Sequence, residues 1–415
     1  MANDSIEFCE SEDAWWKYLL LPFVAGVVGY ATNVLAIKMM FYPIEYFGID
    51  LFRCKDQPFG LIGWQGVVPC KIEKIAGKTV DIILENLLDV KEVFDRLDPE
   101  KFSEVMGKGL MSLVDKVISK TAKEYKLNLS QEQKDEIVVK ASIESNAKFL
   151  QNLIKDMQEQ VYDILDIRHM CLTKIVANKP QMNDIFLEIG REEFKFIKQS
   201  GFYFGFLFGM VQMIIWCFHQ GVWVLPCFGL MVGWATNWLA IKVIFRPLDP
   251  IYICGFKIHG LFLQRQNEVA VSFSRVNCTE IIHTRAIWES ILEGPLHRNF
   301  YSLLRTHSLV FTEELLGGLR TFAIAGMGAQ RFNEMKETVA QKIMDGLPDI
   351  IDQSYEYTTE ALDIENTLRQ KLVGLNSSEF ESILHPAFEE DEILLIIVGA
   401  ALGLVAGTVQ LITLF

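Results

Sequence analysis

The chain has 415 residues, half of them hydrophobic, and a formal net charge of −14. This length is enough for two or three domains, and the apolar content is high for a wholly soluble protein. The acidic balance argues against a nucleic-acid partner, because phosphate contacts require Lys and Arg.

The first predicted membrane segment runs from Trp15 to Phe41 and follows an acidic tail at residues 1–14. The segment reads WWKYLLLPFVAGVVGYATNVLAIKMMF, with an Asn in its middle and a Lys five residues later. No small-residue cleavage site follows the apolar run cleanly, so we expect it to remain as an anchor. Because polar residues interrupt it, we expect a helix with an irregular or tilted section.

Three later segments also qualify as spans of a hydrocarbon core of about 30 Å. Phe202 to Leu225 is rich in Phe, Met, Ile and Trp. Pro226 to Phe245 again has an Asn in its middle and a Lys five residues later. Ile393 to Phe415 contains no charged residue. We therefore predict about four transmembrane helices.

The last of these segments carries a glycine at every fourth position, at Gly399, Gly403 and Gly407. Residues four apart share one face of a helix, and a glycine face lets another helix approach closely. The alternative interpretation is that glycine is simply common in membrane helices.

Two of the segments contain copies of one motif. Gly29–Pro43 and Gly233–Pro247 are identical at ten of fifteen positions without a gap. A weaker similarity follows, between residues 64–76 and 258–270. With four spans, both motif helices cross the membrane in the same direction. The sequence therefore predicts a parallel repeat about a pseudo-twofold axis along the membrane normal.

Four residue types in each motif are candidates for structural or functional roles. Asn is costly in lipid unless it is hydrogen-bonded, and Thr can bond back to the preceding turn. Gly lets a neighbouring backbone approach, and Lys near a helix end can extend to phosphate head groups. The residues concerned are Gly29, Thr32, Asn33, Lys38, Gly233, Thr236, Asn237 and Lys242.

Two interpretations of the motif remain open. In the structural one, the two motif helices pack against each other, Asn to Asn or Asn to backbone, and Lys sets their depth. In the functional one, Asn and Lys bind a lipid head group or an ion.

The predicted topology follows from counting spans. If all four cross, residues 43–201 and 248–391 lie on one side and both termini lie on the other. Basic residues cluster after the first and third spans, while the turn between the second and third has none. The positive-inside rule therefore places both large polar regions in the cytoplasm or its equivalent.

The motif sequence TNWLAIK, followed by a short apolar run and Arg-Pro, resembles the uncharacterised YheB/YjiN-like membrane proteins of bacteria. The run GAALGLVAGTVQLI near the C-terminus is similar to the last helix of that family. The second copy fits better, because the first has Val34 in place of Trp and Tyr42 in place of Arg. The resemblance implies a multi-helix membrane protein with a large cytoplasmic helical part and no established activity.

The polar regions at 78–200 and 266–391 show apolar residues at three- and four-residue intervals, which is typical of amphipathic helices. Such stripes predict a helical bundle or long antiparallel hairpins. An open trough or surface-lying helices that handle lipid would show the same periodicity. Short strands are allowed around 50–70 and 250–265.

We find no enzyme signature. The eight cysteines form no CxxC pair, although Cys54 and Cys70 could bridge in an oxidising compartment. The Gly-rich stretch at 317–331 lacks the Lys and Ser/Thr of a phosphate-binding loop. The sequence therefore predicts no catalytic residue, no metal site and no cofactor.

The predicted fold is an all-α membrane protein with about four transmembrane helices, an internal parallel repeat and long amphipathic cytoplasmic helices. The first functional hypothesis is a structural or interaction protein that acts as a tether, scaffold or lipid-handling protein. The second is an oligomeric transporter or channel component with both Asn/Lys motifs near the pathway. Expected partners are membrane lipids and either further copies of the chain or another membrane protein.

The predicted segments are 1–14, an acidic tail; 15–77, the first membrane repeat and flank; 78–200, cytoplasmic helices; 202–265, a membrane hairpin with the second repeat; 266–391, cytoplasmic helices; and 393–415, the C-terminal span.

Overall fold

A computed structural model describes most of the chain as helix. The described residues are 15–49, 57–60, 62–125, 145–219, 221–253, 256–317, 320–384 and 386–414. The predicted acidic tail at 1–14 and Cys54 lie outside them. The chain forms two compact units. Unit 1 consists of Met1–Ile82, Ile175–Phe273 and Arg369–Phe415, and unit 2 of Ile83–Lys174 and Ser274–Leu368.

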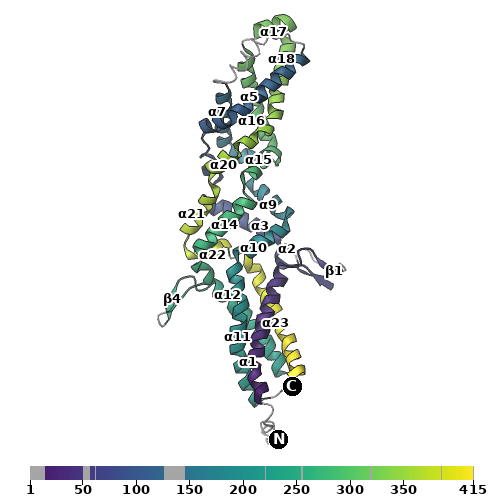
Figure 1. Cartoon of the computed structure of the whole chain (residues 1–415), viewed down its shortest axis with the longest axis vertical. Helices are drawn as coiled ribbons and strands as arrows, with labels where there is room; N and C mark the ends of the chain where they lie inside the picture. The colour runs from purple at the N-terminus through teal and green to yellow at the C-terminus, as the bar shows by residue number, and fades with distance from the viewer. Residues whose placement is uncertain are drawn as a thin grey trace. The chain divides into compact units, whose positions relative to one another are not determined.

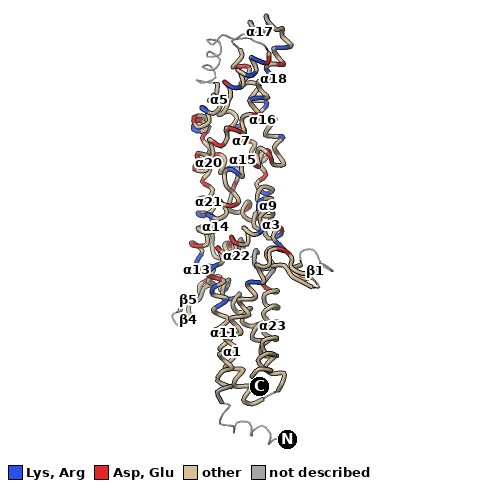
Figure 2. The backbone as a smooth tube through the Cα atoms, turned by 45° about the vertical axis from the view of Figure 1, so that its right-hand side comes forward, with Lys and Arg blue, Asp and Glu red and all other residues tan. Residues whose placement is uncertain are grey.

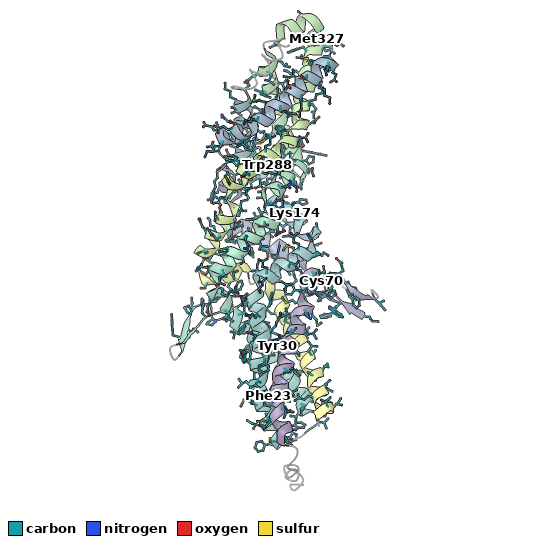
Figure 3. The ribbon with its side chains drawn as sticks, viewed as in Figure 1. Phe23, Tyr30, Cys70, Lys174, Trp288 and Met327 are labelled. Carbon is teal, nitrogen blue, oxygen red and sulfur yellow. The ribbon has the colours of Figure 1, made fainter. Side chains whose placement is uncertain are left out.

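Unit 1 contains four helices that are long and apolar enough to cross a membrane, as the sequence predicts. They are α1 (Trp15–Phe41), α11 (Arg191–Phe218), α12 (Val224–Phe245) and α23 (Pro386–Leu414). Figure 2 shows almost no charged residue along this membrane bundle except toward one end. Aromatic side chains such as those of Phe23 and Tyr30 are exposed on its surface (Figure 3), where acyl chains can contact them.

The four helices pack mainly as two pairs, α1 with α11 and α12 with α23 (Figure 1). The structural interpretation has the two motif helices packing against each other. The helices α1 and α12 do contact each other, but each packs mainly on another helix, α1 on α11 and α12 on α23. Of the expected irregular or tilted section, the irregular form is not found, because α1 and α12 are each one continuous α-helix through the motif; the tilt stays a prediction. The side-chain N–H groups of Asn33 and Asn237 bond a neighbouring helix, and the hydroxyls of Thr32 and Thr236 bond their own helix, so these donors are satisfied without a break in α1 or α12.

Each motif helix ends just before a proline, at Pro43 and Pro247, and both peptide bonds before these prolines are cis. A small antiparallel sheet then follows each helix, in the two regions where the sequence allows strands. The first has the order β1-β3-β2, from Phe47–Ile49, Ile62–Trp64 and Phe59–Gly60. The second pairs β4 (Ile251–Ile253) with β5 (Phe256–Ile258).

Shorter helices complete unit 1 at the end of the bundle where α1 and α12 finish. Asn183, on one of these helices, is fully buried, and its side-chain amide donates to the carbonyl of Phe41 at the end of α1. This bond satisfies one of the carbonyls that a helix C-terminus leaves open. The helices are α2 (Val67–Cys70), α3 (Ile72–Ile82), α10 (Lys179–Ile189), α13 (Leu261–Gln264), α14 (Gln266–Glu280), α21 (Ile364–Gly374) and α22 (Ser377–Leu384), of which α14 and α21 reach into unit 2.

Unit 2 is built from two helix hairpins, α5 (Pro99–Glu124) with α7 (Asn146–Glu159) and α16 (His297–Leu316) with α18 (Ala329–Gly346). The hairpins also pack on each other, α7 on α16 and α5 on α18. The remaining elements are η2 (Ile83–Leu87), α4 (Val90–Phe94), α8 (Val161–Ile164), α9 (Ile167–Ala177, which continues into unit 1), α15 (Thr284–Glu293), α17 (Arg320–Met327), α19 (Pro348–Ile351), η5 (Asp352–Ser354) and α20 (Tyr355–Leu362).

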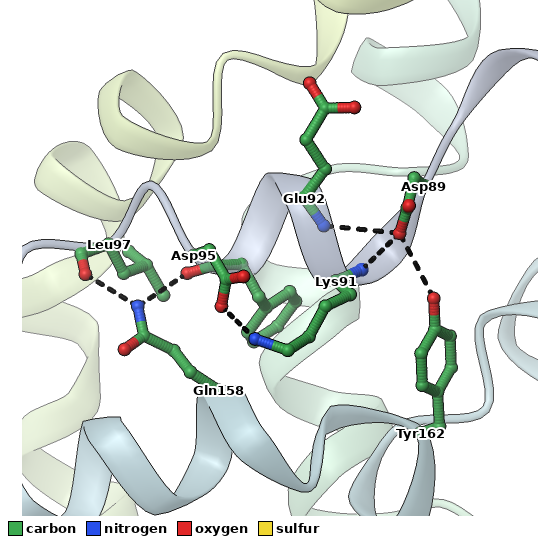
Figure 4. A network of polar contacts seen from close by, with 8 residues as sticks. Asp89, Lys91, Glu92, Asp95, Leu97, Gln158 and Tyr162 are labelled. Atoms are coloured by element: carbon green, nitrogen blue, oxygen red, sulfur yellow. Dashed lines mark hydrogen bonds and ion pairs between the residues drawn. The ribbon is translucent and has the colours of Figure 1, made fainter.

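The core of unit 2 is closed rather than an open trough. Phe149 of α7 stacks on Phe311 of α16 with ring centroids 4.8 Å apart. The predicted apolar stripe of α18, including Met335, Val339 and Ile343, is buried. Figure 4 shows Gln158 of α7, which donates to the carbonyls of Phe94 and Leu97 at 2.9 and 2.8 Å. The Gly-rich stretch at 317–331 contains α17 and the start of α18, apart from residues 318–319, which are not described.

Candidate functional site

The candidate site begins with the motif residues of α1. Asn33 is fully buried, and its Nδ2 donates to the backbone carbonyl of Ile197 on α11 at 2.7 Å. The Thr32 hydroxyl donates back to the carbonyl of Gly29 at 3.0 Å. The amide side chain therefore joins α1 to α11, and the hydroxyl is satisfied within its own helix.

The same residues of α12 make the same kinds of contact with α23. Asn237 Nδ2 donates to the carbonyl of Leu395 at 2.7 Å. The Thr236 hydroxyl donates to the carbonyl of Gly233 at 3.3 Å. In each half of the bundle, the motif asparagine thus donates to a backbone carbonyl of the membrane helix that comes next along the chain, α11 after α1 and α23 after α12.

Glycine makes these close contacts sterically feasible. A Cβ added at Gly29 would lie 2.2 Å from the carbonyl oxygen of Gly201 on α11. A Cβ added at Gly233 would lie 2.1 Å from the carbonyl oxygen of Gly399 and 3.3 Å from the Cα of Gly403 on α23. No side chain fits at these positions while the backbones stay this close.

The glycine face predicted on the last span is one of two. Gly399, Gly403 and Gly407 contact α12, and α11 carries an equivalent face that contacts α1. We missed the second face in the sequence, although the signal was present: GFYFGFLFGMVQMI from 201 and GAALGLVAGTVQLI from 399 share three glycines, Val, Gln and Ile at the same spacing. The residues of the additional face are Gly201, Gly205 and Gly209.

The motif lysines point elsewhere. Lys38 and Lys242 are exposed, whereas the asparagines five residues earlier are buried. Five residues correspond to a rotation of about 140° around an α-helix, so Asn and Lys of one motif lie on different sides of it. The structure therefore brings each asparagine to a partner helix and does not combine Asn and Lys into one site. Both lysines lie near the ends of their helices, at what we call the lysine end of the bundle.

A cavity of about 60 Å³ lies at the lysine end, between the two helix pairs. Its wall is mostly apolar, with the exceptions of Asn237 and two acidic residues, Glu193 of α11 and Glu392 of α23. Asn237 Oδ1 and Glu193 Oε2 are buried and have no hydrogen-bond partner among the described residues. A water molecule or another donor of that size would satisfy them. The lining residues are Ala36, Ile37, Met40, Gly190, Glu193, Phe194, Ile197, Asn237, Ile241, Ile244, Phe245, Phe262, Glu392 and Leu395.

Glu193 also forms an ion pair that the sequence did not predict. Its Oε1 accepts from Arg265 at 2.6 Å, and Arg265 also contacts Glu268 at 2.9 Å. Burial acts to lower the pKa of Arg265, but the contacts with Glu268 and Glu193 outweigh it and raise the pKa above its usual value. The side chain of Glu193 is 7% exposed and that of Arg265 is 28% exposed, so a partly buried ion pair joins the start of α11 to the region after α13.

No group of three or more His, Cys, Asp or Glu side chains is placed to hold a metal ion within the described ranges. Among the described residues, Cys171, Cys217, Cys227 and Cys278 are free thiols. Burial, with a smaller contribution from Asp166, raises the pKa of Cys171 to about 12, which makes it a poor nucleophile. The absence of catalytic activity stays a prediction.

Comparison with known proteins supports the membrane assignment. No family model and no solved structure matches the chain. A UPF0754 membrane protein of Bacillus cytotoxicus is 26% identical over 138 residues, which cover 32% of this chain and 35% of that protein. One from Trichodesmium erythraeum is 37% identical over 78 residues, covering 19% of this chain and 17% of that protein. One from Staphylococcus aureus is 29% identical over 105 residues, covering 25% and 26%.

The chain thus spans about a third or less of the length of these relatives. Their shared name denotes an uncharacterised membrane family, which agrees with the membrane protein of an uncharacterised family expected from the motif. The specific resemblance to the YheB/YjiN-like proteins stays a prediction. The names of the relatives support a location in the membrane and specify no activity.

Proposed function

We propose that the protein is a non-catalytic membrane scaffold, in which a closely packed four-helix anchor supports helical units on the cytoplasmic side. The observation that carries the proposal is the use of both motif asparagines. Each donates to a backbone carbonyl of a glycine-faced helix at 2.7 Å, and neither combines with the lysine of its motif. Polar membrane residues with such bonds serve helix association, and a transport pathway would need them to be available to solute.

The proposal includes an internal parallel repeat that extends beyond the motif. Short sequence elements recur before matching helices of both halves. Leu165-Asp166-Ile167 leads into α9, and Leu362-Asp363-Ile364 leads into α21. Asn178 and Asn376 each accept a backbone N–H three residues later, before α10 and α22. These elements support a duplication that covers most of the chain, with the cavity between the two copies.

Lysine placement supports a role in binding lipid head groups. Lys38 and Lys242 are exposed at the same end of the bundle, and neither forms an ion pair with a carboxylate of the described residues. A basic side chain at the boundary of a membrane span can contact lipid phosphate, and anionic lipids strengthen the contact. Under the positive-inside rule this end faces the cytoplasm.

The test is retention of anionic lipid by the purified full-length protein, measured by native mass spectrometry. Lys38→Gln with Lys242→Gln removes both motif charges. Lys101→Gln with Lys116→Gln, at two exposed positions of α5 in unit 2, changes the net charge equally and serves as the control. We expect the motif variant to lose bound anionic lipid and the control to keep it. Equal retention by both variants would contradict head-group binding at the lysine end.

An oligomeric transporter or channel component is the second candidate, and the cavity favours it. A buried Glu193 oxygen without a partner in a membrane protein is a feature of ion pathways as well as of packing. The transporter alternative predicts cation flux in proteoliposomes that Glu193→Gln abolishes in a folded protein. The scaffold proposal predicts no such flux from the wild-type protein.

A further inference from the structure

The sheet that follows α1 has one strongly apolar face. The register pairs Phe47 with Trp64, Ile49 with Ile62 and Phe59 with Trp64. Residues paired across strands, and residues two apart along a strand, lie on the same face of a sheet. These five large side chains therefore share one face.

Glycines occupy the opposite face. Gly48 and Gly63 pair with each other, and Gly60 pairs with Gly63 from the other strand. Gly48 has φ +145° and Gly63 has φ +140°, a conformation that residues with side chains rarely adopt. An added Cβ at Gly48 would lie 2.2 Å from the carbonyl oxygen of Ile62. The sheet is thus thin on one side and entirely apolar on the other.

The apolar face is not covered by the described part of the chain. Phe47 is 68% exposed, Ile49 58% and Ile62 51%. In an antiparallel sheet with one solvated face, that face normally carries polar residues. Exposed apolar patches of this kind mark sites that contact a protein or a membrane.

The second half of the chain places the two-stranded sheet of β4 and β5 at the corresponding point, and we call this sheet and the three-stranded sheet after α1 the two hairpins. Ile251 and Tyr252 of β4 are 50% and 71% exposed. Both sheets are closed at their base by the same backbone bond, from Gly66 N to Pro43 O at 2.8 Å and from Gly260 N to Pro247 O at 3.0 Å. Figure 1 shows the two hairpins projecting sideways from opposite sides of the lysine end.

We propose that these two hairpins are interfacial membrane anchors, whose apolar side chains insert at the boundary between head groups and acyl chains of the bilayer that α1 and α12 cross. Continuity with the spans argues for lipid as the occupant, because β1 starts six residues after α1 ends. The residue types fit as well: Trp and Tyr concentrate at membrane interfaces, and Phe and Ile bury in the acyl boundary. The flanking lysines reach the head groups at the same depth.

The experiment uses the full-length protein in phosphatidylcholine–phosphatidylglycerol vesicles, with the photo-crosslinking amino acid benzoylphenylalanine in place of Ile49 or, in a second variant, Ile62. The control carries it in place of Val310 of α16, which is also 58% exposed and lies outside the membrane bundle. We expect both hairpin variants to give several-fold more phospholipid adduct than the control.

Lipid adducts no more abundant than at position 310 would overturn the proposal. So would a cross-linked dimer as the main product at positions 49 and 62, since the apolar face would then be an interface between copies of the chain. Because each variant changes a single exposed side chain, its circular dichroism and gel-filtration profile should match the wild type, which keeps either outcome interpretable.

Discussion

Replacing Gly233 with alanine tests the packing of the membrane bundle most sharply. The added methyl would lie 2.1 Å from the carbonyl oxygen of Gly399 and 2.9 Å from its carbonyl carbon. Both contacts are with backbone, so no side chain can rotate away to relieve them. The methyl would lie about 1 Å inside ordinary van der Waals contact with the oxygen, and α12 and α23 would have to separate.

Overpacking of this kind costs about 1–3 kcal/mol, and the separation also stretches the hydrogen bond from Asn237 to Leu395. Gly107 of α5 is the matched control, because an added Cβ there meets no atom within 4 Å. Alanine at that helix-interior position should stabilise unit 2 by about 1 kcal/mol through helix propensity alone. The same glycine-to-alanine change is thus predicted to lower the free energy of unfolding at position 233 and to raise it at position 107.

The assay is unfolding of each full-length variant in mixed detergent micelles as the fraction of denaturing detergent rises, followed by circular dichroism. We expect Gly233→Ala to unfold at a lower fraction of denaturing detergent than the wild type. We expect Gly107→Ala to unfold at a fraction equal to or higher than that of the wild type. A combined Gly233→Ala and Gly399→Ala variant should lose less than the two single losses together, because one separation of the helices relieves both. If Gly233→Ala is as stable as Gly107→Ala, the close backbone contact is not part of the folded protein.

Three further predictions concern polar residues. Asn33→Leu and Asn237→Leu should each destabilise the bundle by about 0.5–2 kcal/mol in the same detergent titration, the usual value of an interhelical hydrogen bond in membranes, and an unchanged transition would count against these bonds. Either Glu193→Gln or Arg265→Gln should lower the thermal unfolding temperature more than the double replacement does, because a single change leaves a partly buried charge unpaired; a double variant less stable than both would contradict this. Since burial raises the pKa of Cys171 to about 12, its thiolate is scarce at pH 8, and alkylation in the folded protein should be slow, should rise with pH up to that value and should become fast on denaturation. Mass spectrometry of the labelled peptide measures it, and equal rates in the folded and denatured protein at pH 8 would refute it.

The sequence predicted the elements that depend on local composition. Spans of apolar residues must be helical in a bilayer, so the four candidate spans could be located from hydropathy alone. The ends of the motif helices could be placed as well, because Pro43 and Pro247 cannot continue a helix. The short strands between 47 and 64 fell in a region where the alternation of apolar residues and glycine is visible.

Helix pairing could not be predicted in the same way. The side-chain amide of Asn33 needs a hydrogen-bond acceptor, but periodicity does not say which helix supplies it. The matching motif on α12 suggested that helix as the partner, and the acceptor lies on α11 instead. The acceptor is a main-chain carbonyl of Ile197, which has no sequence signature. The glycines of α11 would have identified the pairing, since Gly201 and Gly399 precede the same Val-Gln pattern. The ion pair of Glu193 with Arg265 forms between segments that are distant in the sequence, so no spacing of residues along the chain predicts it.

Cross-linking in native membranes tests directly whether the first motif helix, α1, packs on the glycine-faced helix α11 and not on the second motif helix, α12. Phe23 of α1 and Phe206 of α11 have ring centroids 5.1 Å apart. In a protein with Cys217 and Cys227 replaced by Ser, Phe23→Cys with Phe206→Cys should be joined by a short bifunctional thiol reagent. The comparison keeps the native Cys227, which occupies the position in α12 equivalent to Phe23 in α1, and combines it with Phe23→Cys alone. Our account predicts efficient linkage of positions 23 and 206 and little of 23 and 227, whereas the reverse pattern would show that the motif helices pair with each other and would contradict it.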